Sequence, residues 1–488
     1  MARVSLIAWS LGILLGPAQA TSLLAADTPP LDERILDLEK RLAALEAALA
    51  ALEKGREAPP SAEELRRRID LLAQELEELR LGGAAGEEPP RSVYGLGPAA
   101  SRVYNVPRGV SIGGYGEMLY EDFASTDESG QPSGMTDRLD FLRGVLYFGY
   151  KFNDQIVLNS EIEFEHASTE EEGAVSLEFA YLDFLVSTHA NVRAGLVLIP
   201  AGFINELHEP PVYLGARRPE VERRILPTTW RENGVGLFGD VGPFSYRAYL
   251  LAGLDSEGFS AGSSLRGGRQ AGSKSAAEDV ALAARVDFTG LPGLVAGGFI
   301  YHGDSAQGRQ APAGFSLDPN GQAVTPPTAG FDASVTLYDF HVEYKARGLD
   351  LRGLYAAGKV GDAKQINDAN ALDGSGSVGE RFSGWYAQAG FDLLSLGDGG
   401  SERALIPYIR YEEMNTQDRV PSSAPQSVAM NQPASPFAPD PANDLRIWTL
   451  GATYKPIFNV SIKADYARVS NEAETGVDQI SAALGYLF

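Results

Sequence analysis

The first pattern along the chain is a repeat of apolar residues with a period of about 3.5 residues. Apolar residues recur at spacings of four and three over 31–52 and again over 65–79, with Glu, Lys and Arg between them. Pro59 and Pro60 interrupt the pattern between the two stretches. This spacing is the heptad pattern of a coiled coil. We therefore predict an α-helical coiled coil over 31–80.

The two helical stretches have two possible arrangements. They could pack on one another as a hairpin within one chain, or they could pack against the same helices of other subunits. Short isolated helices are only marginally stable in water, and a membrane barrel would offer them no soluble core. The pattern therefore favours a helical bundle between subunits.

After these helices the period changes to two residues. Residues 82–106 are rich in Gly, Ala and Pro and show no periodicity, which predicts a linker. From 107 to 488, apolar and polar residues alternate in segments of about ten residues, the length of strands that cross a membrane. Short polar connections alternate with long ones along this region. The pattern predicts a transmembrane β-barrel with its turns at one end and its long loops at the other.

We count sixteen candidate strands in this region. The fold class that follows is all-β, a sixteen-stranded antiparallel transmembrane β-barrel preceded by the coiled coil. The candidate strands cover 109–123, 138–151, 155–167, 174–187, 191–200, 232–240, 244–254, 278–288, 293–303, 333–346, 349–359, 380–393, 403–413, 444–455, 459–469 and 477–488.

Single strands separate an apolar face from a charged face. In 155–167, Ile156 and Ile162 lie on one face, and Glu161, Glu163 and Glu165 lie on the other. A soluble β-sandwich also alternates, but it would have to place these three carboxylates in its core. The alternation therefore favours an apolar outer face in lipid and a polar lumen in water.

The N-terminal sequence, the Cys content and the net charge limit where the protein can act and what it can bind. Arg3, an apolar run and Ala18-Gln19-Ala20 read as a signal peptide over 1–20. No later apolar run reaches the roughly 20 residues of a spanning helix. The chain has no Cys and a net charge of -24, so a disulfide framework is excluded and nucleic acid is disfavoured as a partner.

Four stretches of the barrel resemble the phosphate-selective porin O and P family. They are GGYGEMLYEDF (113–123), RLDFLRGVLYFGYKFNDQI (138–156), SEIEFEHA (160–167) and HEPPVYLGARRPEVERRILPTTWRENGVG (208–236). The resemblance covers 107–488 and implies a homotrimer of sixteen-stranded barrels in the outer membrane of a Gram-negative-type bacterium. Each barrel would hold an aqueous pore narrowed by infolded loops, and the coiled coil would lie in the periplasm. Phosphate-selective members are thought to use clustered lumenal lysines and an arginine ladder, whereas lysines in this barrel are few and dispersed.

The connection over about 202–232 is the third long loop, which porins usually fold into the lumen. It carries charges of both signs, and opposed charges in a constriction sort solutes by charge and size. The same charges could instead pair with one another and hold the loop in place. The residues predicted to line the constriction are Arg217, Arg218, Arg223, Arg224, Arg231, Glu220 and Glu222.

Further charged residues fall on the lumen face of the predicted strands. They could form a basic strip opposite an acidic one, or they could simply solvate a polar wall. The predicted lumen-lining residues are Arg193, Arg247, Arg285, Arg352, Arg410, Lys463, Glu161, Glu163 and Glu165.

Enzyme chemistry finds little support. The five His residues are scattered, and no Ser-His-acid or His-Glu metal spacing occurs. We expect no catalytic site, no metal and no cofactor. An outer-membrane lipid hydrolase is a further hypothesis, but the sequence offers it no catalytic constellation. The alternating pattern favours a porin for passive diffusion of small hydrophilic solutes, with anions such as phosphate as candidates. The alternative is a structural tether that joins the outer membrane to peptidoglycan through the coiled coil.

Overall fold

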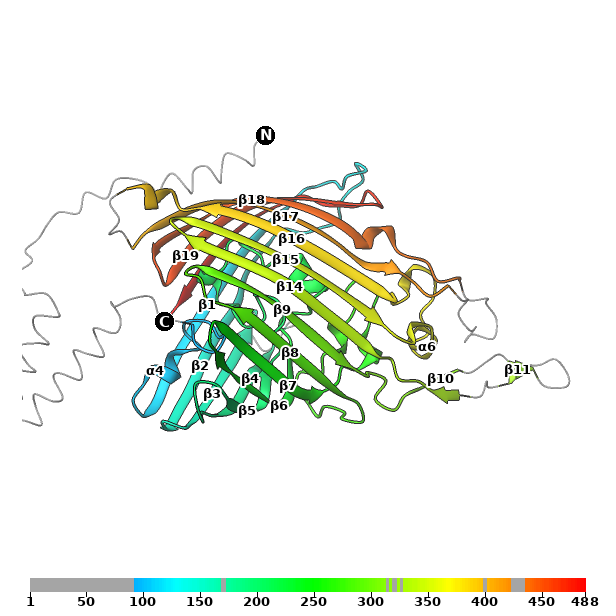
Figure 1. The fold of residues 1–488 in the computed structure, drawn as a ribbon. Coiled ribbons are helices and arrows are strands. Elements are labelled where there is room, and N and C mark those ends of the chain that lie inside the picture. The colour runs from blue at the N-terminus through cyan, green and yellow to red at the C-terminus, as the bar shows by residue number, and fades with distance from the viewer. Residues whose placement is uncertain are drawn as a thin grey trace, which may run out of the picture. The chain divides into compact units, whose positions relative to one another are not determined.

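The computed structural model describes residues 92–167, 173–312, 316–317, 323–324, 328–397, 402–422 and 435–488. In these ranges sixteen strands close into one barrel in which every strand pairs antiparallel with its neighbours in sequence order (Figure 1). The first and last strands close the ring, from Tyr115 opposite Leu487 to Phe123 opposite Gln479.

The barrel strands differ in length from eight to sixteen residues. They are β1 (Gly109–Phe123), β2 (Arg138–Asn153), β3 (Ile156–Glu165), β4 (Val175–Phe184), β5 (Asn191–Leu198), β6 (Arg231–Val241), β7 (Phe244–Ala252), β8 (Val280–Phe288), β9 (Leu294–Gly303), β14 (Val335–Ala346), β15 (Leu349–Val360), β16 (Arg381–Phe391), β17 (Ala404–Arg419), β18 (Asp444–Ile457), β19 (Val460–Asn471) and β20 (Gln479–Leu487).

The remaining elements lie in the connections and before β1. Two small sheets pair β10 (Gln310–Pro312) with β13 (Thr328–Gly330) and β11 (Ser316–Leu317) with β12 (Ala323–Val324). The helices are α4 (Arg102–Asn105), α5 (Glu220–Arg224) and α6 (Ala363–Ala369), and the 3-10 turns are η1 (Pro210–Val212), η2 (Ser256–Gly258), η3 (Arg266–Gly268), η4 (Gly374–Gly376), η5 (Leu393–Leu396) and η6 (Pro441–Asn443).

The predicted antiparallel barrel of sixteen strands is confirmed for the described residues. The largest difference from the predicted bounds is at β17. The pattern predicts that this strand ends at residue 413, but it continues to Arg419. Its polar last part still pairs with the neighbouring strands: Asn415 lies opposite Ser383 on one side and Asp444 on the other. The long connections with β10 and α6 lie at one end, and tight turns such as the one from Val241 to Phe244 lie at the other (Figure 1). The predicted signal peptide (1–20) and coiled coil (31–80) fall outside the described residues, so the tether stays a prediction.

The outer surface of this barrel is unlike that of a water-soluble protein. Large apolar side chains on the outside are exposed, among them Leu139 at 70%, Phe340 at 63% and Leu450 at 63%, while Lys463 and Asp465 on the inside are buried. Soluble proteins rarely bury charged residues and rarely expose broad apolar surfaces. An apolar outer band around a polar interior is typical of a barrel in lipid.

No helix in the described part of the chain is long and apolar enough to cross a membrane.

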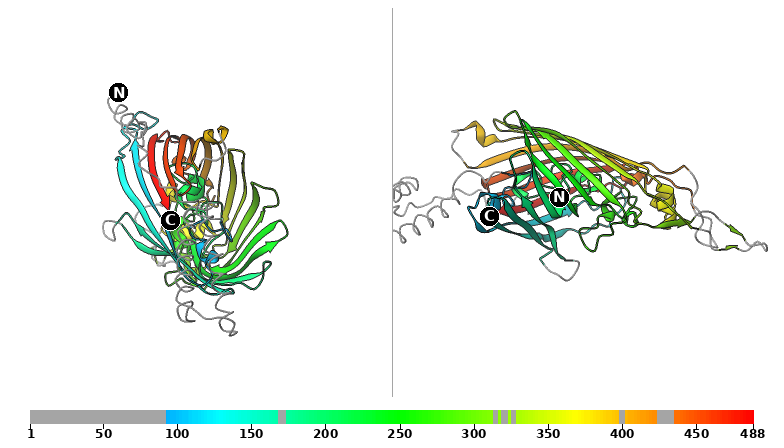
Figure 2. Two further views of the ribbon diagram at one scale, coloured as in Figure 1. Left: turned by 90° about the vertical axis from the view of Figure 1, so that its left-hand side faces the viewer. Right: turned by 60° about the horizontal axis from the view of Figure 1, so that its bottom comes forward.

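Two segments that are not strands fill much of the barrel interior. One is the connection 199–230 between β5 and β6, called the third loop below. The other is residues 92–106, which include α4 and precede β1. Figure 2 shows the ring of strands from one end with connecting segments inside it. The predicted linker, 82–106, therefore has its last part inside the barrel.

Candidate functional site

The third loop lies in the lumen because carboxylates on the strands bind its backbone. The amide of Gly202 donates to Asp339 Oδ2 at 2.8 Å, that of Val221 to Glu412 Oε2 at 3.1 Å and that of Ala216 to Asp465 Oδ2 at 2.6 Å. These carboxylates come from β14, β17 and β19. A loop without a sheet partner must satisfy its buried N–H groups in some other way, and bonds to carboxylates are among the stronger ones. The loop is thus fixed across the barrel.

Side-chain contacts add further anchors for the third loop. The Tyr213 hydroxyl donates to Glu117 Oε1 at 2.8 Å, and His208 Nε2 lies 3.0 Å from Glu161 Oε1. Glu222 is fully buried: its Oε2 accepts from the amides of Phe203 and Ile204 at 2.8 and 2.6 Å. The structure therefore places Glu222, a predicted constriction residue, among the bonds that hold the loop together rather than on its surface.

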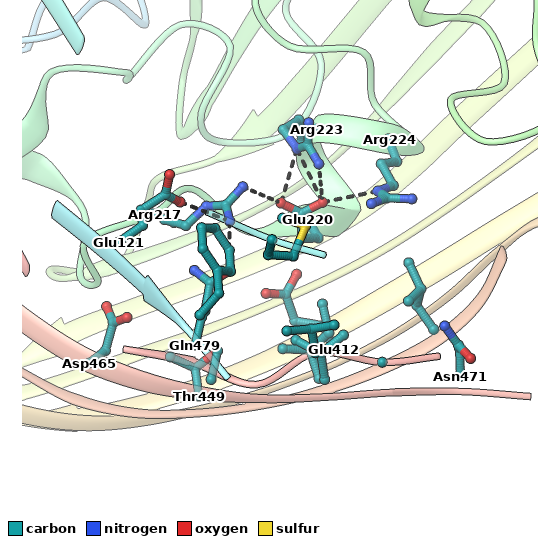
Figure 3. Close-up of a pocket in the computed structure, with 18 of the residues that line it drawn as sticks. Glu121, Arg217, Glu220, Arg223, Arg224, Glu412, Thr449, Asp465, Asn471 and Gln479 are labelled. Atoms are coloured by element: carbon teal, nitrogen blue, oxygen red, sulfur yellow. Dashed lines mark hydrogen bonds and ion pairs between the residues drawn. The ribbon is translucent and has the colours of Figure 1, made fainter. Parts of the chain in front are cut away.

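Three arginines of the third loop surround one carboxylate. Glu220 accepts from Arg217 at 3.3 Å, from Arg223 at 2.6 Å and from Arg224 at 3.0 Å (Figure 3). Burial raises the pKa of this carboxyl, but the three guanidinium groups outweigh that effect and lower the pKa to about 2. Arg217 also bonds to Glu121 on β1 at 3.2 Å. The cluster keeps a positive excess next to Glu220.

The other two predicted arginines of the loop region differ from each other. Arg218 bonds only weakly to neutral oxygens, at 3.3 Å to Thr229 Oγ1 and 3.4 Å to the carbonyl of His208. Arg231, the first residue of β6, forms an ion pair with Glu178 on β4 at 2.7 Å. Arg218 therefore belongs to the arginine cluster, whereas Arg231 belongs to an ion pair between strands of the barrel wall.

A cavity of about 390 Å³ separates the third loop from the wall formed by β17–β20 and β1 (Figure 3). Six arginines and four carboxylates line it, which is an excess of two positive charges. The charged lining residues are Arg138, Arg217, Arg218, Arg223, Arg224, Arg410, Glu121, Glu220, Glu412 and Asp465.

The predicted lumen arginines on β5–β15 form ion pairs within the barrel. Arg193 bonds to Asp183 at 2.8 Å, and Arg352 bonds to Glu343. Asp287 forms ion pairs with Arg285 at 2.7 Å and with Arg247. The His341 ring lies between two carboxylates, 2.7 Å from Asp287 and 2.6 Å from Asp339. All of these basic side chains are buried. Four of the six predicted lumen cations, Arg193, Arg247, Arg285 and Arg352, are thus neutralised where they stand.

The predicted acidic strip is also largely neutralised. Glu161 accepts from His208 of the third loop, and Glu163 pairs with Arg143 at 3.1 Å. Glu165 is half-buried at the end of β3. A register shift between Glu161 and Ile162 in the pairing of β3 with β4 interrupts the row. The three carboxylates therefore do not form one free acidic face.

Two predicted cations on β17 and β19 keep unpaired donors. Arg410 bonds to Glu412 through Nε at 2.9 Å, but its Nη1 has no hydrogen-bond partner among the described residues. The Lys463 ammonium lies 3.7 Å from the centre of the Tyr213 ring and has no hydrogen-bond partner among them either. Buried donors of this kind usually bind water or an ion. Of the two, Arg410 lines the cavity described above, and Lys463 is buried beneath Tyr213.

Several residues that matter for this site escaped the sequence analysis. Glu412, Asp465 and Asp339 bind the third loop, yet only their place on the polar face of a strand marks them in the sequence. Glu209 of the loop binds the segment 92–106, for which no periodic signal exists. Within the described residues, no group of three or more His, Asp or Glu side chains could hold a metal ion.

Comparison with known proteins gives one clear relative. An uncharacterized protein of Aquifex aeolicus (strain VF5) is 35% identical over 404 residues, which cover 81% of this chain and 83% of that protein. No model of a known protein family matches the chain.

Solved structures similar to the chain are outer-membrane proteins of low identity. OmpF of Salmonella typhi has a TM-score of 0.47 with 13% identity over 79% of this chain and 99% of its own. The anion-selective porin from Comamonas acidovorans has a TM-score of 0.45 with 10% identity over 78% and 99%. OmpTdeltaL8 of Vibrio cholerae has a TM-score of 0.46 with 12% identity over 78% and 100%. Such likeness concerns the fold alone, and the resemblance to the phosphate-selective porin O and P family stays a prediction.

Proposed function

We propose that this chain, which belongs to the same family as the uncharacterized protein of Aquifex aeolicus (strain VF5), is an outer-membrane porin for passive diffusion of small hydrophilic solutes with a preference for anions. The closed barrel with an apolar outside and a charged interior supports the membrane channel. Homotrimer formation and contact with peptidoglycan stay predictions beside it.

The anion preference rests on one observation, the charge of the cavity. The whole chain has a net charge of -24, but the cavity lining carries six arginines against four carboxylates. Fixed charges in a narrow, poorly hydrated passage act more strongly than the same charges in bulk water. The local excess therefore decides which ions enter, whatever the charge of the rest of the chain.

The unpaired donors of Arg410 and Lys463 extend this preference along the same wall. Arg410 lines the cavity, and Lys463 is on β19, beneath Tyr213 of the third loop. An anion that leaves the arginine cluster would meet donors with no competing hydrogen-bond partner among the described residues. We place the solute path along this wall for that reason.

The test is the reversal potential of single channels in a planar bilayer under a potassium chloride gradient. The wild type should be anion-selective. Replacing Arg217, Arg218, Arg223 and Arg224 together with Gln removes four of the six positive charges, so we expect the chloride to potassium permeability ratio to fall by about tenfold.

The matched control is Arg446→Gln, near the start of β18, whose side chain is 45% exposed and lies on the opposite face of the strand from the cavity-lining residues Leu445 and Ile447. This change should leave the reversal potential as it is. A cation-selective wild type, or a quadruple variant with unchanged selectivity, would overturn the proposal.

A further inference from the structure

Residues 92–106 are packed inside the barrel like a core segment. Leu96, Ala99, Ala100 and Val103 are at most 3% exposed. Val103 lies against Gly149 of β2, where a Cβ would come within 2.5 Å of its Cγ2. The strand thus has a glycine at the place where this segment makes contact.

One carboxylate of the third loop holds this segment. Glu209, which is 1% exposed, accepts from the backbone N–H of Ala99 and of Ala100, each at 3.0 Å to Oε1. A Cβ at Gly97 would lie 2.5 Å from Glu209 Cδ, so only a residue without a side chain fits there. Burial raises the pKa of this loop carboxyl to about 7, while the two backbone donors oppose that rise. Two buried N–H groups that donate to one carboxylate form a specific binding site for this segment.

The wall of β3–β6 binds the other side of the segment. Asn159 donates to the carbonyl of Ala100 at 2.9 Å, and the Tyr104 hydroxyl donates to Asp183 Oδ2 at 2.7 Å. The Tyr94 ring packs edge-on against the rings of Tyr104 and Phe238 at 5.1 and 4.9 Å. The segment therefore lies between this wall and the third loop.

These contacts close one side of the lumen. The third loop alone would leave Asn159 and Asp183 facing water, because they bind this segment and not the loop. With the segment in place, both are at most 1% exposed. Space for solutes is left on the opposite side, at the arginine cavity. The segment belongs to the chain itself and is joined to β1 only by Pro107 and Arg108.

We propose that residues 92–106 are an internal plug of the pore, seated between the third loop and the β1–β6 wall and latched by Glu209. Its withdrawal opens a second passage through the barrel along that wall. This proposal rests on the chain being a channel, but it does not depend on which ions the channel prefers.

A reversible latch tests the plug without unfolding the barrel. The chain has no Cys, and the Cβ built at Gly97 lies 3.0 Å from Cγ of Glu209, a spacing compatible with a disulfide. The double variant Gly97→Cys with Glu209→Cys should conduct like the wild type when it is oxidised. After reduction the double variant has neither the disulfide nor the Glu209 carboxylate to hold the segment, and we expect its single-channel conductance to rise about twofold or more.

Glu257→Cys, in an exposed turn, controls for the reductant and should not change. Deleting 92–106 should raise the conductance permanently by a similar factor. Equal conductance of the double variant before and after reduction, with no rise on deletion, would overturn the plug while the porin function stands. If neither the wild type nor the deletion conducts, the channel function fails and the plug with it.

Discussion

The two walls of the lumen use the same residue types in different ways. On β2–β15, Arg193, Arg285 and Arg352 each bond to a carboxylate on the same or a neighbouring strand and are buried. On β17–β19, Arg410 bonds to Glu412 but leaves Nη1 unpaired, and the Lys463 ammonium has no hydrogen-bond partner among the described residues. Arg247 of the first wall leaves only its Nε unpaired, beside its two ion pairs. The first wall carries the anchors of the plug, and Arg410 of the second wall lines the cavity.

This difference indicates that a basic residue on a lumen face need not act on solutes. Where a loop or plug covers the wall, a buried cation needs a partner, because an isolated buried charge costs several kcal/mol. Arg410 and Lys463 are buried to the same degree, at 3% and 1% exposed, and a buried donor without a protein partner usually binds water or an ion. The local partners of each cation, more than its residue type or its burial, therefore separate the two walls of this barrel.

The largest effect should come from breaking the paired wall. Asp287→Ala leaves Arg247, Arg285 and His341 without their shared carboxylate, and we expect a loss of about 3–5 kcal/mol in the free energy of unfolding. Urea unfolding of the barrel in lipid vesicles measures it. The control is Asp154→Ala, whose ion pair with Lys151 is exposed, and it should change nothing measurable. An equally stable Asp287→Ala barrel would show that the wall does not depend on this network.

Removing a cation from the wall of β17–β19 should change anion preference more than stability. Lys463→Met removes a cation that has no hydrogen-bond partner among the described residues, and Met keeps the apolar contact with Tyr213. We expect a stability change below about 1 kcal/mol and a fall of severalfold in anion preference in the bilayer. Arg193→Met is the matched change on the other wall and should lower stability instead. The comparison fails if Lys463→Met is the more destabilising of the two.

The smallest effect should appear in the pH dependence of the arginine cluster. The pKa of Glu220 is lowered from 4.5 to about 2, so its ion pairs contribute their full stability above pH 4.5 and lose it as the pH falls toward 2. We expect the difference in reversal potential between wild type and Glu220→Gln to stay constant down to about pH 4 and to shrink toward pH 2. A difference that already disappears near pH 5 would show that the three arginines do not hold this carboxylate.

The sequence predicts most of the barrel because its constraints are local. Each strand must place apolar residues toward lipid and polar residues toward water, so alternation marks Ile462 and Lys463 for opposite faces without knowledge of their neighbours. Turn residues such as Gly242 and Pro243 then mark where a strand ends. These signals depend on a few adjacent residues.

The site is harder to predict because its partners are distant in sequence. Ala216 binds Asp465, 249 residues away, and Ala99 binds Glu209, 110 residues away. No local pattern distinguishes Glu222, which is buried in the loop, from Glu220, which lines the cavity. The plug segment lacks periodicity because its shape follows the space that the loop leaves, so its sequence reads as a linker.

Bromide soaked into crystals of the full-length protein and located by its anomalous scattering would test the account most directly. We expect bromide beside Arg218 and Arg410 in the cavity and beside Lys463, whose donors include unpaired ones, with none at Arg193, Arg285 or Arg352, where carboxylates already occupy the donors. Bromide at the three paired arginines, or none in the cavity, would contradict the division of the lumen into a paired wall and a solute path.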